Sequence, residues 1–202
     1  MVPAMTLALD ANFGSVQGWR DAFAALAVAA GNRPAELRLS FVPSTGALIN
    51  ERVAQAQEAS AERVPMLSMQ LPHDLPTFIA GIDWDPVYER YQHAVHAASE
   101  GFGASHDDVT SALLLDVRRA GVFEQAGTTI PGARWCDPAA VATWAATLPI
   151  NRPVLVYCVY GHEVSRATAM RLRAAGVDAR YLAGGIDGWT AAGRPLVEKR
   201  SG

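Results

Sequence analysis

The stretch from Pro153 to Gly176 constrains the fold more than any other part of the sequence. It opens at residues 154–157 with a short run of β-branched and aromatic side chains, which is typical of a strand buried on both faces. Residues 165–175 are rich in helix formers and end at a glycine. Cys158 begins the tight loop between the two segments. The sequence therefore predicts a cysteine at the C-terminal end of a buried strand, facing the start of a helix.

A cysteine in this position has two interpretations. The first turn of a helix presents unpaired N–H groups and the positive end of the helix dipole, and both favour an anion. A cysteine held there is favoured as the thiolate, which is the nucleophilic form. The loop amides would also hold an oxyanion or the negative charge of a persulfide. Alternatively, Cys158 is simply a small buried apolar residue, and strand-then-loop context leaves both interpretations open.

Composition excludes several classes of function. The 202 residues are half hydrophobic, which is enough for one large domain or two small ones. A net charge of −3 gives no electrostatic basis for binding nucleic acid or an anionic membrane. The two cysteines, Cys136 and Cys158, do not make a disulfide framework and favour a reducing compartment. The first residues lack a signal-peptide pattern and no apolar run is long enough to span a membrane, so we expect a cytoplasmic protein.

Residues 1–105 are predicted to be mainly helical and carry no recognisable chemistry. We expect helices over residues 16–30, 44–63 and 85–99, a short strand over 37–42, and an ordered connection with about one helical turn over 64–82. His93 and His96 lie three apart on the last helix, but the sequence implies no third ligand, so a solvated polar face is the simpler interpretation and no metal site is predicted. An exposed apolar face in this region would also serve homodimer formation.

Strands and helices alternate from Ser111 onward, after a glycine-containing boundary at residues 101–108. The expected strands cover residues 112–117, 133–136, 154–157 and 179–182, and the expected helices cover 122–126, 137–148, 165–175 and 188–192. We therefore predict an α/β fold whose second domain, residues 106–202, is a small doubly wound parallel sheet. Ligands of such sheets bind beyond the carboxyl ends of the strands, where Cys158 lies.

Four short motifs follow one another in this second domain. They are Asp-Val-Arg at residues 116–118, Ile-Pro-Gly-Ala at 130–133, Cys158 with Gly161, and Gly-Gly-Ile-Asp-Gly-Trp at 184–189. Together they resemble the rhodanese domain, a sulfurtransferase module, over about residues 108–200, and the resemblance does not extend to residues 1–105. It implies that Cys158 takes sulfur from a donor such as thiosulfate or a persulfide. The sulfur then passes to a thiol or to cyanide, without a metal or an organic cofactor.

The resemblance also implies a set of site residues. Cys158 is the implied catalytic residue, and the amides of the following loop would stabilise charge on the donor or the persulfide. That substrate-binding loop consists of Val159, Tyr160, Gly161, His162, Glu163, Val164 and Ser165. Ser165 would hydrogen-bond to the sulfur, cap the helix, or do both. Three further residues would have supporting roles. Asp116 would accept hydrogen bonds from loop backbone, and Arg118 would pair with a carboxylate or supply charge. Arg166 would supply charge.

Departures from the family pattern bear on the substrate. Thr129 stands where the family usually has a histidine, and the loop lacks the arginine or lysine that thiosulfate-using members often carry. Glu163 would repel a dianion if it points inward. His162 would offset that charge or act as an acid, although an exposed histidine is the simpler interpretation. Cys136 is interpreted as a bystander, with a resolving thiol as the alternative.

The spacing from Cys158 to Gly176 is one residue longer than is typical of the family, and an extra residue in the loop would open further alternatives. Loops of this length resemble those of dual-specificity phosphatases and arsenate reductases. Those enzymes need an arginine at the sixth position after the cysteine, and this chain has Val164 there. A further alternative is a carrier or regulatory module that holds sulfur or an oxyanion without turnover, with the helical half binding a partner.

Overall fold

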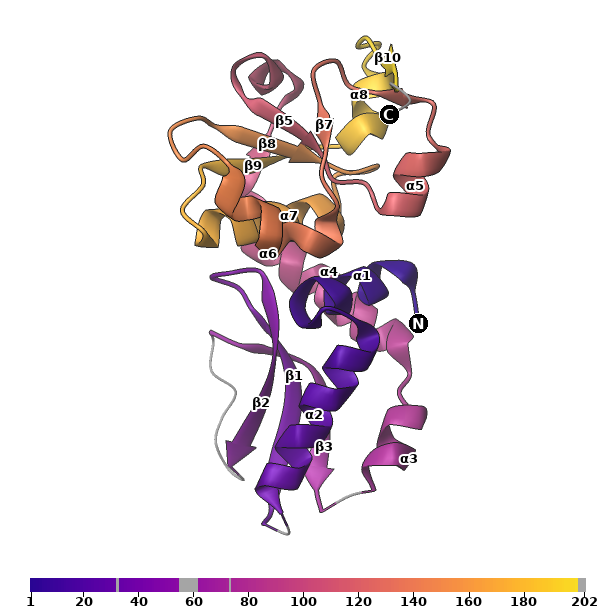
Figure 1. The fold of residues 1–202 in the computed structure, drawn as a ribbon, viewed down its shortest axis with the longest axis vertical. Helices are drawn as coiled ribbons and strands as arrows, with labels where there is room; N and C mark the ends of the chain where they lie inside the picture. Colours follow the sequence, from indigo (N-terminus) through magenta and orange to yellow (C-terminus); the bar gives the residue numbers. More distant parts are fainter. Residues whose placement is uncertain (32, 55–61, 73, 200–202) are drawn as a thin grey trace. The chain divides into compact units, whose positions relative to one another are not determined.

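The computed structural model describes residues 1–31, 33–54, 62–72 and 74–199, and the chain forms two compact units, Met1–Ala94 and Val95–Gly202 (Figure 1). Helix α4 (Trp84–Ser99) runs from the first unit into the second. None of the helices within these described ranges combines the length and the apolarity needed to span a bilayer.

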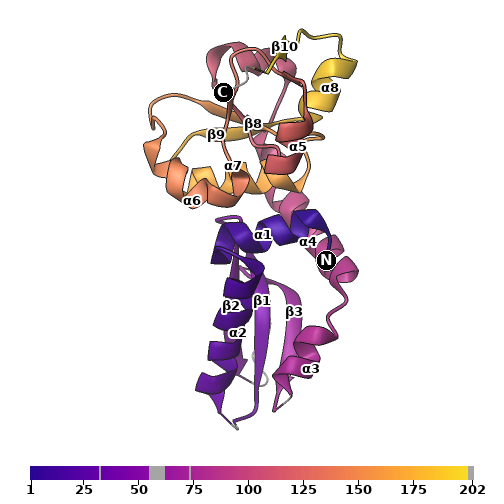
Figure 2. The same ribbon diagram turned by 45° about the vertical axis from the view of Figure 1, so that its right-hand side comes forward.

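The N-terminal unit combines helices with a three-stranded antiparallel sheet of order β2-β1-β3. Helix α2 begins after Ser15, whose hydroxyl accepts from the N–H of Gly18 at 2.8 Å. The helix runs along the sheet (Figures 1 and 2), and its buried side chains include Trp19 and Phe23. The elements before α4 are α1 (Pro3–Phe13), α2 (Val16–Ala30), β1 (Ala35–Val42), β2 (Ala47–Ala54), β3 (Val64–Leu71) and α3 (Leu75–Ala80). Helices cover more of this unit than strands do, as the prediction of a mainly helical region requires.

The helix predicted over residues 44–63 is wrong, because residues 47–54 form strand β2. Thr45 and Gly46 lie in the turn of a hairpin that pairs Val42 with Ala47, and Gly46 has φ +70°. Of the apolar residues read as a helical stripe, Leu48 and Val53 are buried in this strand, where an odd spacing places them on opposite faces. Residues 55–61 of the predicted helix, including Ala56, lie outside the described residues.

Residues 64–71 form strand β3, whereas the sequence indicated an irregular connection because of its prolines. Pro65 is tolerated here because β3 is an edge strand and its register with β1 shifts between Leu39 and Ser40. Helix α3 supplies the short helical turn expected in this region. The prolines suggested an irregular segment, but a proline destabilises a strand little where its backbone nitrogen has no hydrogen bond to make with a neighbouring strand.

The C-terminal unit contains the predicted parallel sheet, with five strands in the order β4-β9-β8-β5-β7. Its strands are β4 (Gly103–Ala104), β5 (Leu113–Asp116), β7 (Arg134–Trp135), β8 (Val154–Tyr157) and β9 (Ala179–Leu182). The α-helices between and after them are α5 (Ala120–Gln125), α6 (Val141–Trp144), α7 (Glu163–Ala174) and α8 (Gly185–Ala191). Short 3-10 helices lie at Glu100–Phe102, His106–Ser111, Pro138–Ala140 and Ala145–Thr147, so the helix predicted over 137–148 is broken into three pieces. A small antiparallel pair, β6 (Thr128–Thr129) and β10 (Val197–Glu198), completes the unit.

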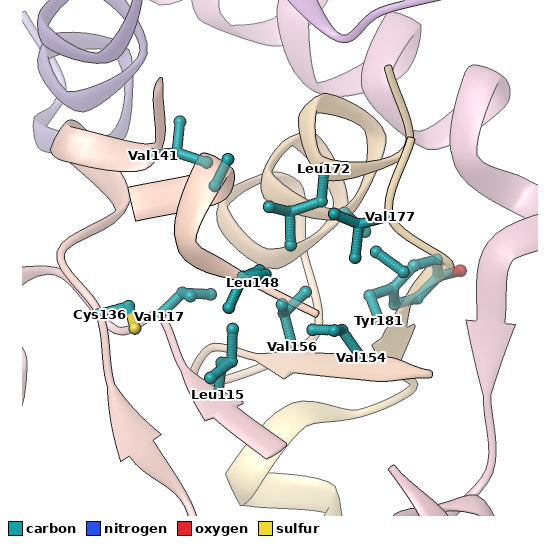
Figure 3. Close-up of a cluster of buried hydrophobic side chains, with 13 residues drawn as sticks. Leu115, Val117, Cys136, Val141, Leu148, Val154, Val156, Leu172, Val177 and Tyr181 are labelled. Carbon is teal, nitrogen blue, oxygen red and sulfur yellow. The ribbon is translucent and has the colours of Figure 1, made fainter. Parts of the chain in front are cut away.

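Apolar side chains fill both faces of this sheet because successive residues of a strand point to opposite sides. Val154 and Val156 of β8 join the cluster under α6 and α7, which is drawn in Figure 3. Leu155 and Tyr157 join the cluster on the other face, with Ile186 and Trp189 of α8 as members. Strand β8 is therefore buried on both faces, as its composition predicts, and its C-terminal end is rigidly placed.

Candidate active site

Cys158 follows directly after β8, at the carboxyl edge of the sheet. Strands β5 and β9 flank β8 on its two sides, so the position of the cysteine is set by the centre of the sheet. The thiol is buried, and its Sγ lies 3.2 Å from the Oγ of Ser165, within hydrogen-bond distance with either atom as donor. The arrangement of strand, loop and helix matches the prediction made from the sequence.

Helix α7 begins at Glu163, two residues earlier than predicted. His162 is its N-cap residue but makes no side-chain capping bond, and Ser165 lies within the first turn. The predicted capping role of Ser165 is therefore wrong, whereas its predicted contact with the sulfur is present. Because the first N–H groups of a helix have no partner within the helix, this start directs donors toward the loop.

The loop after Cys158 is held by backbone bonds from the start of α8. The N–H of Ile186 donates to the carbonyl oxygen of Cys158 at 3.0 Å, and the N–H of Asp187 donates to that of Val159 at 3.0 Å. Helix α8 begins at Gly185, three residues earlier than predicted, and its N-cap is Gly184. The start of this helix is thus part of the site, and only the family motif pointed to it.

Two glycines let the loop and the start of α8 approach each other closely. Gly161 has φ +71°, and a Cβ placed on it would lie 2.7 Å from the carbonyl oxygen of Leu182. Gly185 has φ +58°, and a Cβ there would lie 2.4 Å from the carbonyl oxygen of Val159 and 2.5 Å from that of Cys158. Both positions require glycine for the backbone angle and for the space.

Arg166 is occupied in holding the loop. Its Nε donates to the carbonyl oxygen of Gly161 at 2.8 Å, and its Nη1 donates to the Oγ of Ser99 at 3.3 Å. Its guanidinium carbon also lies 4.2 Å from the centre of the Tyr181 ring. These contacts give Arg166 a positioning role, and its predicted role as a source of charge for the donor stays a prediction. Ser99 was missed because no sequence signal links it to the loop.

The exposed part of the loop is aromatic. Tyr160 is 56% exposed and His162 is also exposed, with their ring centres 5.7 Å apart. The ring of His96, at the end of α4, lies 5.7 Å from that of His162 on another side. The sequence left His96 open as a metal ligand or, more simply, as part of a solvated polar face. In the described parts of the chain, no three histidine, cysteine, aspartate or glutamate side chains are placed to hold a metal ion.

Asp116 and Arg118 form a buried ion pair beside the site. The Nε of Arg118 lies 3.0 Å and 2.9 Å from the two carboxylate oxygens, and its Nη2 also donates to the carbonyl oxygen of Thr128 at 3.0 Å. The backbone donor to Asp116 is the N–H of Arg118 at 3.0 Å, not the backbone of the cysteine loop as expected. Of the two roles open to Arg118, the structure has the ion pair.

The same carboxylate anchors the residue that precedes the cysteine. The hydroxyl of Tyr157 donates to Asp116 at 2.9 Å, lies 2.7 Å from the hydroxyl of Thr129, and accepts from the N–H of Ile130 at 3.3 Å. Burial, with the nearby Asp116 charge, raises the pKa of Tyr157 above its ordinary value. The family departure at Thr129 therefore has a structural role, since its hydroxyl completes this buried network.

The remaining predicted loop residues are placed as follows. Glu163 is buried at the first position of α7, and Val164 is half-buried at the next position. Cys136 follows β7 and is separated from Cys158 by strand β5, so their Cα atoms are about 10 Å apart at the usual strand spacing. That distance exceeds the reach of a disulfide, about 7 Å. Burial raises the pKa of the Cys136 thiol, which further favours a bystander.

Several solved structures are similar to part of this chain. Solved structures that resemble the chain include a full-length protein from Lactobacillus plantarum, 22% identical, covering 55% of this chain and 99% of that one with a TM-score of 0.47. A rhodanese-like domain protein from Staphylococcus aureus is 22% identical and covers 48% of this chain and 98% of its own, with a TM-score of 0.41. A protein of unknown function from Rhodopseudomonas palustris, described as a possible tyrosine phosphatase, is 19% identical and covers 52% and 92%, with a TM-score of 0.46.

No curated protein matches the chain. Residues 102–192 match a family model described as the rhodanese-like domain, which spans all four motifs and the cysteine loop. Residues 102–192 of this chain are therefore similar to the rhodanese-like domain family.

Proposed function

We propose that this domain is a sulfurtransferase that works through a persulfide on Cys158. The observation that carries the proposal is the placement of its Sγ, which is buried at the end of β8 and 3.2 Å from the hydroxyl of Ser165 in the first turn of α7. A thiolate there has a hydroxyl donor and a helix start beside it, and both favour negative charge on sulfur.

The reaction has two halves. The Cys158 thiolate attacks the outer sulfur of the donor, a new S–S bond forms at Sγ, and the rest of the donor leaves with the electron pair of the broken bond. With thiosulfate, the leaving group is sulfite. A thiolate or cyanide then attacks the outer sulfur of the persulfide, takes it as a persulfide or thiocyanate, and restores the Cys158 thiolate. The Ser165 hydroxyl and the loop amides would hold the negative charge of the persulfide between the two halves.

Phosphoryl or arsenate chemistry at the same loop is less well supported. An oxyanion clamp needs an arginine with its guanidinium turned toward the ligand. The sixth position after Cys158 is Val164, and the guanidinium of Arg166 is occupied by the carbonyl of Gly161 and the hydroxyl of Ser99. We therefore retain sulfur transfer as the proposed chemistry.

Intact mass spectrometry of the full chain tests the proposal. The reduced protein would be incubated separately with thiosulfate and with an organic persulfide, beside a Cys158→Ser variant and a Cys136→Ser variant. We expect a gain of one sulfur atom in the wild type and in Cys136→Ser, lost on adding cyanide, and no gain in Cys158→Ser. Failure of every donor to load a reduced, folded protein would overturn the proposal.

The same measurement separates an enzyme from a carrier. Thiocyanate production over many turnovers at a steady rate would identify an enzyme. A persulfide that forms and then persists in the presence of cyanide or a thiol would identify a carrier that does not turn over.

A further inference from the structure

We infer that this site takes its sulfur from an organic donor with at most one negative charge, an organic persulfide rather than thiosulfate. Two observations carry this: aromatic side chains are exposed on the cysteine loop, and the two arginines near it, Arg118 and Arg166, already have partners. The inference rests on the proposed sulfur transfer through Cys158 and adds the class of donor. It makes Tyr160 and His162 specificity-determining residues.

The cysteine loop offers a donor little free positive charge. Within residues 158–166, all of which the structure describes, Arg166 is the only arginine or lysine. Its guanidinium is held by the carbonyl of Gly161, the hydroxyl of Ser99 and the face of the Tyr181 ring. Turning it toward a donor would break these contacts and release the loop. It is therefore a poor partner for a dianion.

Arg118 cannot replace it. The residue is only 4% exposed, its Nε lies within 3.0 Å of both carboxylate oxygens of Asp116, and its Nη2 donates both to that carboxylate and to the carbonyl of Thr128. Removing it from this pair would leave a buried carboxylate without its counter-ion, which is strongly unfavourable. Glu163, buried at the start of α7, adds an acidic group to the same loop. The charges at this loop thus do not match the two negative charges of thiosulfate.

The side chains that the loop exposes to solvent are aromatic rings. Tyr160 lies two residues after the cysteine and is 56% exposed, an unusual exposure for a tyrosine in a loop that is otherwise largely buried. Its ring and that of His162 lie 5.7 Å apart. These two flat side chains, on the loop that follows Cys158, offer contact area to an organic group. An inorganic dianion would take hydrogen bonds from the phenol and the imidazole but would make no use of the ring faces.

The corresponding chemistry is balanced. The Cys158 thiolate attacks the outer sulfur of R–S–SH, the donor S–S bond breaks, and a new S–S bond forms at Sγ. The R–S group leaves as a thiolate and takes up the proton of the outer sulfur, so the products are the Cys158 persulfide anion and the thiol R–SH. No oxidant or reductant is consumed.

A matched set of donors tests the inference without changing the type of S–S bond that breaks. Thiosulfate, methanethiosulfonate and benzenethiosulfonate all transfer an outer sulfur attached to an oxidised sulfur. The second has one negative charge fewer than the first, and the third adds an aromatic ring. We would measure kcat/KM for loading of Cys158 by quenched-flow mass spectrometry and divide each value by the rate at which the same donor reacts with free N-acetylcysteine. We expect normalised values to rise by about tenfold from the first donor to the second, as one unfavourable charge is removed, and to rise again for the third.

Variants at the exposed ring remove any remaining effect of intrinsic donor reactivity. Tyr160→Arg places a cation on the loop, so its thiosulfate loading should rise by about tenfold while benzenethiosulfonate loading falls. Ile150→Arg is the matched control. Ile150 is 75% exposed and precedes β8, so it lies at the opposite end of that strand from Cys158. It should leave all three donors unchanged.

Three results would overturn the inference. The first is a normalised thiosulfate value equal to or above that of methanethiosulfonate. The second is a Tyr160→Arg variant that loads thiosulfate no faster than wild type. The third is a fall of tenfold or more in thiosulfate loading for the Arg119→Gln variant. Arg119 is the half-buried N-cap residue of α5, and such a fall would mean that it supplies positive charge to the donor. In each case Cys158 still loads, so sulfur transfer stands. If none of the donors loads Cys158, the proposed function fails and the inference fails with it.

Discussion

Replacing Gly185 by alanine tests whether the start of α8 sets the shape of the cysteine loop. At this residue φ is +58°, which costs a residue with a Cβ about 1–2 kcal/mol. The added Cβ would also lie 2.4 Å from the carbonyl oxygen of Val159, about 0.6 Å inside the 3.0 Å limit for real Cβ contacts, and 2.5 Å from that of Cys158. Both neighbours are backbone atoms, so the loop itself must move.

The expected size of the effect follows from these contacts. Backbone strain together with the forced displacement should lower the free energy of unfolding by about 3 kcal/mol. A shift of several tenths of an ångström at the nucleophile should slow loading of sulfur onto Cys158 by about tenfold to a hundredfold. Loading would be measured by quenched mass spectrometry, and stability by urea unfolding of the full chain.

Gly193→Ala is the matched control. Gly193 follows the other end of α8 and has φ +67°, but a Cβ there would meet nothing within 4 Å. This variant therefore carries the same kind of backbone strain without the contact to the loop, and it should lose about 1 kcal/mol of stability with sulfur loading unchanged. If Gly185→Ala loaded sulfur as fast as Gly193→Ala, the reasoning about close approach would be refuted.

Further predictions concern the supporting residues. Tyr157→Phe should lower the free energy of unfolding by about 2 kcal/mol in urea titrations, because it removes a buried hydrogen bond to a carboxylate; an unchanged midpoint would contradict this. Arg166→Gln should reduce kcat for sulfur transfer about tenfold with little change in KM, and Arg166→Lys should restore part of it, since the role is to hold a carbonyl; an effect confined to KM would instead indicate donor binding. Cys136→Ser should change sulfur loading less than twofold. In the wild type, the raised pKa of the Cys136 thiol means that its alkylation, followed by mass spectrometry, should require a higher pH than alkylation of a free cysteine in solution. Hydrogen bonds from Arg38 lower the pKa of Glu36 to about 2. The contribution of Glu36 to the free energy of unfolding is therefore present above pH 4.5 and is lost as the pH falls from 4.5 toward 2. Acid titrations of the Glu36→Gln variant should not show this loss of stability.

Much of the C-terminal unit was predictable because its signals are local. A four-residue apolar strand, a cysteine and a helix ending at glycine lie within one stretch, and each is recognised from adjacent residues. The antiparallel sheet of the first unit was predicted less well. Residues 47–54 have apolar spacing that fits a helix as well as a strand, and pairing with β1 decides between them. Pro65 in β3 likewise depends on an edge position that no local signal reveals.

The sequence by itself determined that Cys158 ends a buried strand, that a parallel α/β sheet surrounds it, and that the loop contains no arginine or lysine before Arg166. Only the tertiary structure decided how the charged and polar groups are used. It pairs Arg118 with Asp116, turns Arg166 onto the carbonyl of Gly161, and joins the start of α8 to the loop through Gly185. The physical reason is that strand and helix formation depend on residues close in the chain, whereas the partner of a buried charge is chosen by whichever distant groups the packed fold brings within hydrogen-bond distance.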